Sequence, residues 1–175
     1  MSEQVLIRPL QEAEAPALCG LAREIWRAHY PGIISAAQIE YMLEERYNEA
    51  LIRDELARDE LWWDVLLLDG RMVGYTSYFP AIPTDRAGAM KIDKLYLHPG
   101  AHRQGYGGRL IDHVAAFAAR CGCTQLTLAV NRHNLTAIAA YRKHGFVIAE
   151  TSVREIGGGF LMDDYIMVRP VRRKA

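Results

Sequence analysis

The stretch LYLHPGAHRQGYGGRLID, residues 95–112, constrains the fold of this chain more than any other feature of its sequence. It begins as a strand-like segment, continues as a loop rich in glycine, and ends in a segment with helical spacing of apolar residues. A glycine inside a helix costs roughly 0.5–1 kcal/mol relative to alanine. Either the backbone here adopts conformations that other residues disfavour, or another group must approach it closely.

The three glycines of this loop, Gly105, Gly107 and Gly108, leave two interpretations open. Unpaired N–H groups and the dipole at a helix N-terminus favour a bound anion such as a pyrophosphate, and Arg103 adds a positive charge. The alternative is a tight turn whose glycines serve helix–sheet packing. The spacing matches neither the Gly-x-Gly-x-x-Gly dinucleotide pattern nor a phosphate loop ending in Gly-Lys-Ser/Thr.

Periodicity in the rest of the chain predicts an α/β fold with a mixed sheet. An opening strand is followed by helices, then by a meander of strands in which Asp69-Gly70 is a hairpin signal. After the glycine loop the order is helix, strand, helix and two strands. The expected helices cover 12–29, 35–47, 49–58, 106–121 and 134–145, and the expected strands cover 5–10, 61–69, 72–79, 89–99, 124–130, 146–155 and 160–169.

Composition argues against several classes of partner. Lys plus Arg and Asp plus Glu both number 21, so no net charge would attract nucleic acid or an anionic membrane. We find no signal peptide and no run of about 18 apolar residues, the length that a spanning helix needs. The three cysteines have no zinc-site spacing. We therefore expect a cytoplasmic protein with reduced thiols, no metal, no nucleic-acid partner and no membrane partner.

The segment NLTAIAAYRKHGF, residues 134–146, supplies a second signal. Asn134 and Tyr141 are seven residues apart, so they fall on nearly the same helix face, about 10.5 Å apart along the axis. The small Ala137 between them would let an extended ligand lie against the helix, and Asn134 can both donate to and accept from an amide. The alternative is that Asn134 is only an N-cap and Tyr141 only a core residue.

Together, LYLHPGAHRQGYGGRLI and NLTAIAAYRKHGF resemble the GNAT superfamily of acetyl-CoA-dependent N-acetyltransferases. The resemblance extends in outline from LIRPLQEAE to YIMVRPV. It implies one α/β domain over residues 1–175, with a mixed, mostly antiparallel sheet of about seven strands flanked by helices. It also implies acetyl-CoA as the acetyl donor and direct attack of an amine on the thioester.

The resemblance further implies which residues bind the cofactor. Backbone groups of the strand would hold the pantetheine arm, the loop amides would hold the pyrophosphate, and Asn134 would contact the pantetheine. Tyr141 would lie near the thioester sulfur and protonate the leaving thiolate. His102 departs from the family, which usually has Gln or Arg there, and leaves side-chain anchoring of the pyrophosphate open. The implied strand residues are Leu95, Tyr96 and Leu97, and the loop residues are Arg103, Gln104, Gly105, Tyr106, Gly107 and Gly108.

The general base is less well defined by the sequence. Asp93 precedes Leu95 by two positions, so both point to the same face of the strand. A carboxylate with an ordinary pKa near 3.9 is a weak base for an amine, so burial or a water relay would be needed. The alternative is that Asp93 pairs at the surface with Lys91 or Lys94. Weaker candidates for the base are Glu24, Tyr30, His98 and His102.

The acceptor pocket should come from the early helices and the last hairpin. We expect Trp26, His29 and Tyr30, with Tyr47, to line it, and Asp163 beside Asp164 to attract a cationic amine. The alternative is that the aromatic residues are core and the two aspartates are a solvated hairpin. HYPGIISAAQIEYMLEERY and GGGFLMDDYIM are similar, more loosely, to the polyamine (spermidine/spermine) acetyltransferase branch.

Three functions therefore remain open at this point. The first is acetylation of a small-molecule primary amine, such as a polyamine. The second is acetylation of a protein or peptide N-terminus, and the third is a non-catalytic acyl-CoA-binding sensor. A homodimer formed through the last strands is also open.

Overall fold

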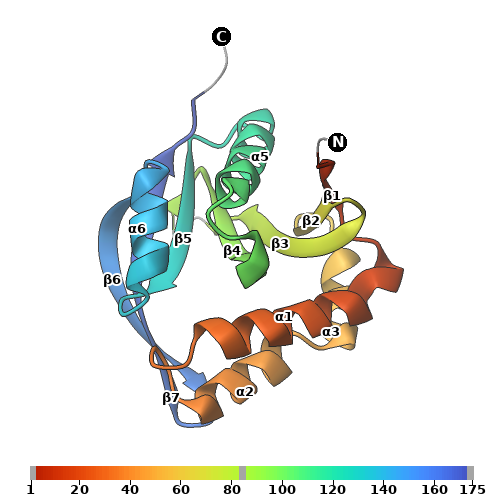
Figure 1. Cartoon of the computed structure of the whole chain (residues 1–175). Coiled ribbons are helices and arrows are strands. Elements are labelled where there is room, and N and C mark those ends of the chain that lie inside the picture. The colour runs from red at the N-terminus through yellow and green to blue at the C-terminus, as the bar shows by residue number, and fades with distance from the viewer. Residues whose placement is uncertain (1–2, 83–85, 173–175) are drawn as a thin grey trace. The chain divides into compact units, whose positions relative to one another are not determined.

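The computed structural model describes residues 3–82 and 86–172, and Figure 1 shows its helices and strands. The order along the chain agrees with the sequence prediction. The helices are α1 (Ala15–His29), α2 (Ala36–Arg46), α3 (Glu49–Leu56), α5 (Tyr106–Arg120) and α6 (Leu135–Lys143). Short 3-10 turns are η1 (Glu12–Glu14) and η2 (Pro99–Ala101). The strands are β1 (Val5–Pro9), β2 (Trp62–Leu68), β3 (Arg71–Pro80), β4 (Ala89–Leu97), β5 (Gln125–Asn131), β6 (Val147–Gly157) and β7 (Phe160–Pro170).

Seven strands form one sheet in the order β1-β2-β3-β4-β5-β7-β6. The β1–β2, β2–β3, β5–β7 and β6–β7 pairs are antiparallel, whereas β4 and β5 are parallel. The prediction of an α/β fold with a mixed, mostly antiparallel sheet of about seven strands is confirmed.

The chain divides into two compact units. Unit 1 contains the residues up to Tyr78 together with Lys94–Leu110, and unit 2 contains Phe79–Asp93 together with the chain from Ile111 onward. The expectation of one domain over residues 1–175 stays a prediction.

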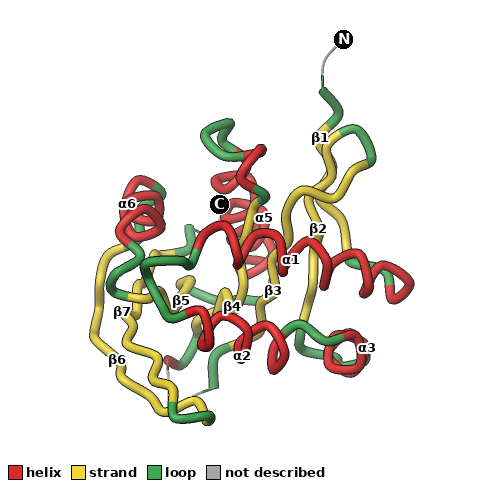
Figure 2. The backbone as a smooth tube through the Cα atoms, turned by 60° about the horizontal axis from the view of Figure 1, so that its bottom comes forward, coloured by secondary structure: helices red, strands yellow, loops and turns green. Residues whose placement is uncertain are grey.

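The helices of unit 1 begin where their capping residues lie. The side chain of Ser35 accepts a hydrogen bond from the Gln38 amide and caps α2, and Asn48 caps α3 in the same way through the Leu51 amide. The first helix differs slightly from expectation, because η1 precedes it and α1 starts only at Ala15. Figures 1 and 2 show α1 and α2 lying side by side.

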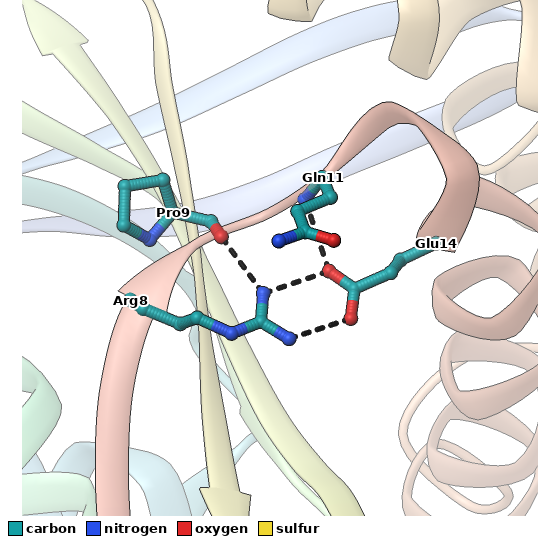
Figure 3. Close-up of polar contacts among 4 residues, drawn as sticks. All are labelled: Arg8, Pro9, Gln11 and Glu14. Atoms are coloured by element: carbon teal, nitrogen blue, oxygen red, sulfur yellow. Dashed lines mark hydrogen bonds and ion pairs between the residues drawn. The ribbon is translucent and has the colours of Figure 1, made fainter.

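Polar contacts connect the end of β1 to the start of α1 (Figure 3). The Arg8 guanidinium donates to both carboxylate oxygens of Glu14, at 2.7 and 2.8 Å, and to the Pro9 carbonyl at 3.0 Å. The Gln11 amide also donates to the Glu14 carboxylate, at 3.0 Å. The hydrogen bond from Arg8 is the main reason that the pKa of Glu14 lies below its usual value. These contacts fix the direction in which the chain enters the helix.

The β2–β3 hairpin turns at the two residues that the sequence singled out. Asp69 and Gly70 have φ values of 48° and 82°, the left-handed conformations that a two-residue hairpin turn requires. A bulge between Leu66 and Leu67 shifts the register of this pair of strands. On the face of unit 1 that carries Leu66, the core continues through Tyr106 and Leu110 of α5.

Unit 2 contains β5, β6 and β7 with helix α6. Asn134 caps α6, and Gly145, with φ of 87°, follows its C-terminus. The β6–β7 turn contains Gly157, Gly158 and Gly159, all with positive φ. Within the described residues of the whole chain, no helix is long and apolar enough to cross a membrane.

Candidate active site

The glycine loop directs a set of backbone N–H groups outward at the start of α5. Arg103 and Gly105 both have left-handed backbone conformations, with φ of 60° and 81°. Within residues 3–82 and 86–172, no backbone N–H from Arg103 to Gly108 donates to a protein acceptor, whereas the Arg109 amide bonds to the Gly105 carbonyl. Such a curved run of donors at a positive helix end suits an anion. The alternative, a tight turn whose glycines serve helix–sheet packing, stays open, and a Cβ added at Gly107 would lie 3.7 Å from Leu97 Cδ1.

The side chain of His102 binds the end of β4 rather than pointing freely from the loop. Its Nε2 lies 2.9 Å from the Leu97 carbonyl oxygen, and because a carbonyl only accepts, this nitrogen carries the proton. The Leu97 carbonyl is one of the backbone groups expected to bind the cofactor arm. Its oxygen already accepts a hydrogen bond from His102. His102 therefore connects the loop to the strand.

Gly74 allows β3 to approach this end of β4, a role that the sequence analysis missed. A Cβ added there would lie 2.5 Å from Leu97 Cδ2 and 2.9 Å from the Tyr96 carbonyl oxygen. The neighbouring Val73 carbonyl accepts from the His98 amide at 2.7 Å. A side chain at position 74 would therefore displace the backbone that leads into the glycine loop.

Five aromatic residues meet on the other face of the β3–β4 region of unit 1. The sequence grouped Trp26, Tyr30 and Tyr47, and the structure brings these three together. It adds Tyr75 from β3 and Tyr96 from β4, whose rings are 5.6 Å apart. The sequence analysis assigned neither residue to the aromatic group. Each lies two positions from a buried position of its own strand, and this spacing was a signal that it belongs to the buried face. We call these five residues the aromatic cluster.

The ring contacts of the aromatic cluster are close. Trp26 lies 4.4 Å from Tyr30, 5.7 Å from Tyr47 and 5.6 Å from Tyr96, measured between ring centroids. The predicted pocket residue His29 contacts the cluster through Tyr30, edge to face at 5.0 Å. Trp26, Tyr30 and Tyr47 are buried, and their burial agrees with the alternative that they are core residues.

The polar atoms of the aromatic cluster are only partly paired. The hydroxyls of Tyr30 and Tyr96 are 2.9 Å apart. By contrast, Trp26 Nε1 and the hydroxyls of Tyr47 and Tyr75 are buried and make no hydrogen bond among the described residues. Burial raises the pKa of Tyr47, Tyr75 and Tyr96 well above the usual value for a phenol. These hydroxyls therefore stay neutral, and three buried polar atoms remain unsatisfied at a cost in stability.

Lys94 lies beside the aromatic cluster and is 3% exposed. Its ammonium is 4.8 Å from the centroid of the Trp63 ring and 5.8 Å from that of Tyr47, within the range of cation–π attraction. Lys94 is therefore not a surface residue, and the alternative that Asp93 pairs with Lys91 or Lys94 stays a prediction. Asp93 is half-buried, and its role as the base stays a prediction.

Two weaker candidates for the base contact each other in unit 1. His98 Nε2 lies 3.6 Å from a carboxylate oxygen of Glu24, and His98 Nδ1 accepts a hydrogen bond from the Gly100 amide at 3.0 Å. Both ring nitrogens of His98 therefore face a partner, and its observed contacts are those of a residue that shapes turn η2.

The remaining predicted residues belong to unit 2. Asn134 is 4% exposed, and its side-chain oxygen accepts from the Ala137 amide at 3.3 Å, so Asn134 is an N-cap, and its expected contact with the cofactor stays a prediction. Tyr141 lies on the same helix face, partly buried, with its ring 5.6 Å from that of Phe146. Asp163 pairs with Arg132 at 3.3 Å, which partly compensates its charge.

The predicted site residues thus fall into two groups. Unit 1 holds the glycine loop, the strand end at Leu95–Leu97 and the aromatic cluster. Unit 2 holds Asp93, Asn134, Tyr141 and Asp163. Their roles in binding and catalysis stay predictions.

Comparisons with known proteins give a consistent picture. The model of the acetyltransferase (GNAT) family matches residues 20–146. The spermidine N(1)-acetyltransferase of Thermoplasma acidophilum is 27% identical over 161 residues, covering 90% of this chain and 94% of that protein. The thialysine N-epsilon-acetyltransferase of Bos taurus is 27% identical over 150 residues, covering 81% and 83%.

A solved structure also shares the fold. The PaiA N-acetyltransferase of Thermoplasma acidophilum, crystallised in complex with coenzyme A, superposes with a TM-score of 0.80 at 24% identity. The superposition covers 95% of this chain and 99% of that one.

Proposed function

The chain belongs to the acetyltransferase (GNAT) family, and from this premise we propose that it transfers an acetyl group from acetyl-CoA to a primary amine of a small molecule. The family match and the named relatives confirm the predicted enzyme class, an acetyltransferase. One observation carries the choice of cofactor: the run of unpaired N–H groups from Arg103 to Gly108 at the start of α5.

The diphosphate of coenzyme A suits this loop because it presents several anionic oxygens to closely spaced donors. Backbone amides lose no side-chain entropy on binding, and the helix dipole and Arg103 add favourable charge. We assign the pantetheine arm to the backbone at Leu95–Leu97 and to Asn134. The PaiA N-acetyltransferase was crystallised with coenzyme A, which supports coenzyme A as the cofactor.

The reaction then needs three events. An alkylamine with a pKa near 10.4 must lose a proton, which costs about 4–5 kcal/mol at pH 7. Its lone pair forms the new C–N bond with the thioester carbon, and the C–S bond breaks to release a thiolate. Asp93, directly or through a water, accepts the ammonium proton, the Tyr141 phenol donates its proton to the sulfur, and the second proton that the nitrogen loses as the amide forms restores the phenol. Backbone N–H groups where β4 ends would stabilise the carbonyl oxygen.

The acceptor is assigned to the aromatic cluster, with His29 beside it and Asp163 attracting a cationic amine. The three unsatisfied polar atoms of the cluster favour a ligand with hydrogen-bonding groups. Relatives named for spermidine and for thialysine both act on an amine of a small molecule, and a polyamine is the substrate class we propose. The proposed location is the cytoplasm.

A substitution in the loop tests the cofactor assignment. Gly105 has φ of 81° and nothing within 4 Å of an added Cβ, so Gly105→Ala strains only the backbone. We expect acetyl-CoA to raise the Tm of the unsubstituted protein, NADH and ATP to leave it unchanged, and Gly105→Ala to weaken coenzyme A binding at least tenfold. Thermal shift and calorimetry measure both effects.

The control is Gly122→Ala, because Gly122 has a similar φ of 79°, is equally open and lies outside the loop. It should lose similar stability and keep its affinity for coenzyme A. Equal thermal shifts with all three nucleotides, no shift at all, or equal loss of affinity in both variants would contradict the proposal.

A further inference from the structure

The side chain of Tyr106 connects the glycine loop to the core of unit 1. This residue is 6% exposed and belongs to the same core cluster as Leu66, Ala101 and Leu110. Its backbone N–H is one of the loop amides that donate to no acceptor within the described part of the chain. Because the direction of a helical side chain is coupled to that of its backbone, a change in the placement of the ring also turns this amide. The geometry of the loop therefore depends on the contacts that hold the Tyr106 side chain.

One of these contacts comes from the start of the chain. The Tyr106 hydroxyl donates a hydrogen bond to the carboxylate of Glu3, which is 103 positions away in the sequence. An ionised carboxylate can only accept, so the phenol is the donor. This hydrogen bond is the main reason that the pKa of Tyr106 lies above its usual value. The phenol therefore keeps its proton, and remains a donor, throughout the neutral pH range.

Glu3 is itself held in place by its neighbour in the sequence. The Gln4 amide donates to Asp69 Oδ1 at 2.9 Å, and the Asp69 amide donates to the Gln4 carbonyl at 2.9 Å. The next residue, Val5, already pairs with Leu68 in the sheet. The first residues of a domain are usually poorly ordered unless they are tied down, and these hydrogen bonds tie Glu3 to the β2–β3 turn. The carboxylate is therefore presented to Tyr106 from a fixed position.

The charge of Glu3 does not explain its place beside a loop that suits an anion. A carboxylate would by charge alone repel a diphosphate. Glu3 contacts the hydroxyl, the atom of Tyr106 farthest from the loop backbone, and the Arg109 guanidinium lies 5.8 Å from the centroid of the same ring. The positive charge of Arg109 opposes that of the carboxylate. The contact is therefore better explained by the orientation that it gives to Tyr106.

We propose that Glu3 is a positioning residue for coenzyme A: it holds the Tyr106 side chain and thereby directs the amides at the start of α5 toward the diphosphate. The inference rests on the proposed function, because that function assigns the loop to coenzyme A. Coupling between two binding events is reciprocal. Bound coenzyme A should therefore stabilise the contact between Glu3 and Tyr106 by the same factor by which the contact strengthens coenzyme A binding.

Removal of the contact from either side tests the proposal. In calorimetry with coenzyme A, we expect Glu3→Ala and Tyr106→Phe each to weaken binding about fivefold. Both changes remove the same hydrogen bond, so the double variant should bind no more weakly than Tyr106→Phe alone. Glu3→Gln keeps an acceptor oxygen at the same distance from the backbone and should recover most of the affinity. A purely structural loss would not follow this pattern.

Hydrogen exchange at the Gln4 amide, followed by NMR, measures the coupling in the opposite direction. Bound coenzyme A should slow this exchange in the unsubstituted protein and leave it unchanged in Tyr106→Phe, in which Glu3 has lost its donor. Circular dichroism confirms that each variant is folded. Glu3 is exposed, so Glu3→Ala tests the proposal even if Tyr106→Phe does not fold.

Glu60→Ala is the matched control. Glu60 is an exposed acid of unit 1 with no hydrogen bond or ion pair to any described residue, and its loss should leave the affinity for coenzyme A unchanged. If the unsubstituted protein binds coenzyme A, then a Glu3→Ala variant that binds it equally well or more tightly overturns this inference alone. So do additive losses in the double variant and a Glu3→Gln variant as weak as Glu3→Ala. An unsubstituted protein that does not bind coenzyme A overturns the proposed function and this inference together.

Discussion

The proposed role of Tyr141 depends on a single atom, its phenol oxygen. A phenol with a pKa near 10 is protonated at neutral pH and can protonate a thiolate as it leaves. We expect Tyr141→Phe to lower kcat at least tenfold and to change the Kd for coenzyme A less than twofold, measured by thiol release and calorimetry. Tyr165→Phe, which removes a phenol from β7, should leave both constants unchanged. A Tyr141→Phe enzyme with full kcat contradicts the role as general acid.

The sequence predicts which residues cap a helix better than it predicts the backbone conformation of a loop residue. Asn134 was placed correctly as a helix cap because capping depends on neighbours within four residues. The left-handed conformation of Arg103 was not expected, because a non-glycine residue rarely adopts it and the surrounding loop imposes it. The contact of His102 with the Leu97 carbonyl was also missed, because it too depends on the surrounding loop.

Among the elements, the approach of β3 to β4 positions the backbone before the glycine loop. Gly74→Ala would place a methyl group 2.9 Å from the Tyr96 carbonyl oxygen, so the strand end must shift. We expect the affinity for coenzyme A to fall at least fivefold and the Tm to fall by several degrees. Gly20→Ala in α1, where an added Cβ meets nothing within 4 Å, is the control and should keep its affinity. Unchanged affinity in Gly74→Ala would show that the strand end does not contact the cofactor.

The elements themselves were predicted well because periodicity, caps and turn residues are local signals. The hairpin at Asp69-Gly70 and the helix over 135–143 are examples. Gly74 and the meeting of Tyr75 with Tyr96 were missed, because each depends on residues about twenty positions apart along the chain that pair only in the folded sheet. Sequence periodicity carries no information about such pairs.

For the whole molecule, three elements belong to both compact units. Strand β3 passes from unit 1 to unit 2 after Tyr78, strand β4 passes from unit 2 to unit 1 after Asp93, and helix α5 passes from unit 1 to unit 2 after Leu110. Neither unit can therefore unfold without disrupting an element of the other, and we expect a single cooperative transition. All three tryptophans, Trp26, Trp62 and Trp63, lie in unit 1, so tryptophan fluorescence reports unit 1 alone.

Urea unfolding followed by tryptophan fluorescence and by far-UV circular dichroism should give the same midpoint within about 0.2 M. A reducing agent keeps the three free cysteines from forming disulfides during the measurement. Midpoints that separate by more than that would indicate two domains and would contradict the expectation of one domain over residues 1–175.

The hydroxyl contact between Tyr30 and Tyr96 has a practical consequence for protein engineering. Tyr96 turns its ring toward α1 and the residues assigned to the amine, while its main chain lies in the segment assigned to coenzyme A. Any library that randomises position 96 to broaden the range of amines will also alter how tightly the donor is held. Selections for new acceptors should therefore spare this strand and diversify the helical side of the cluster instead.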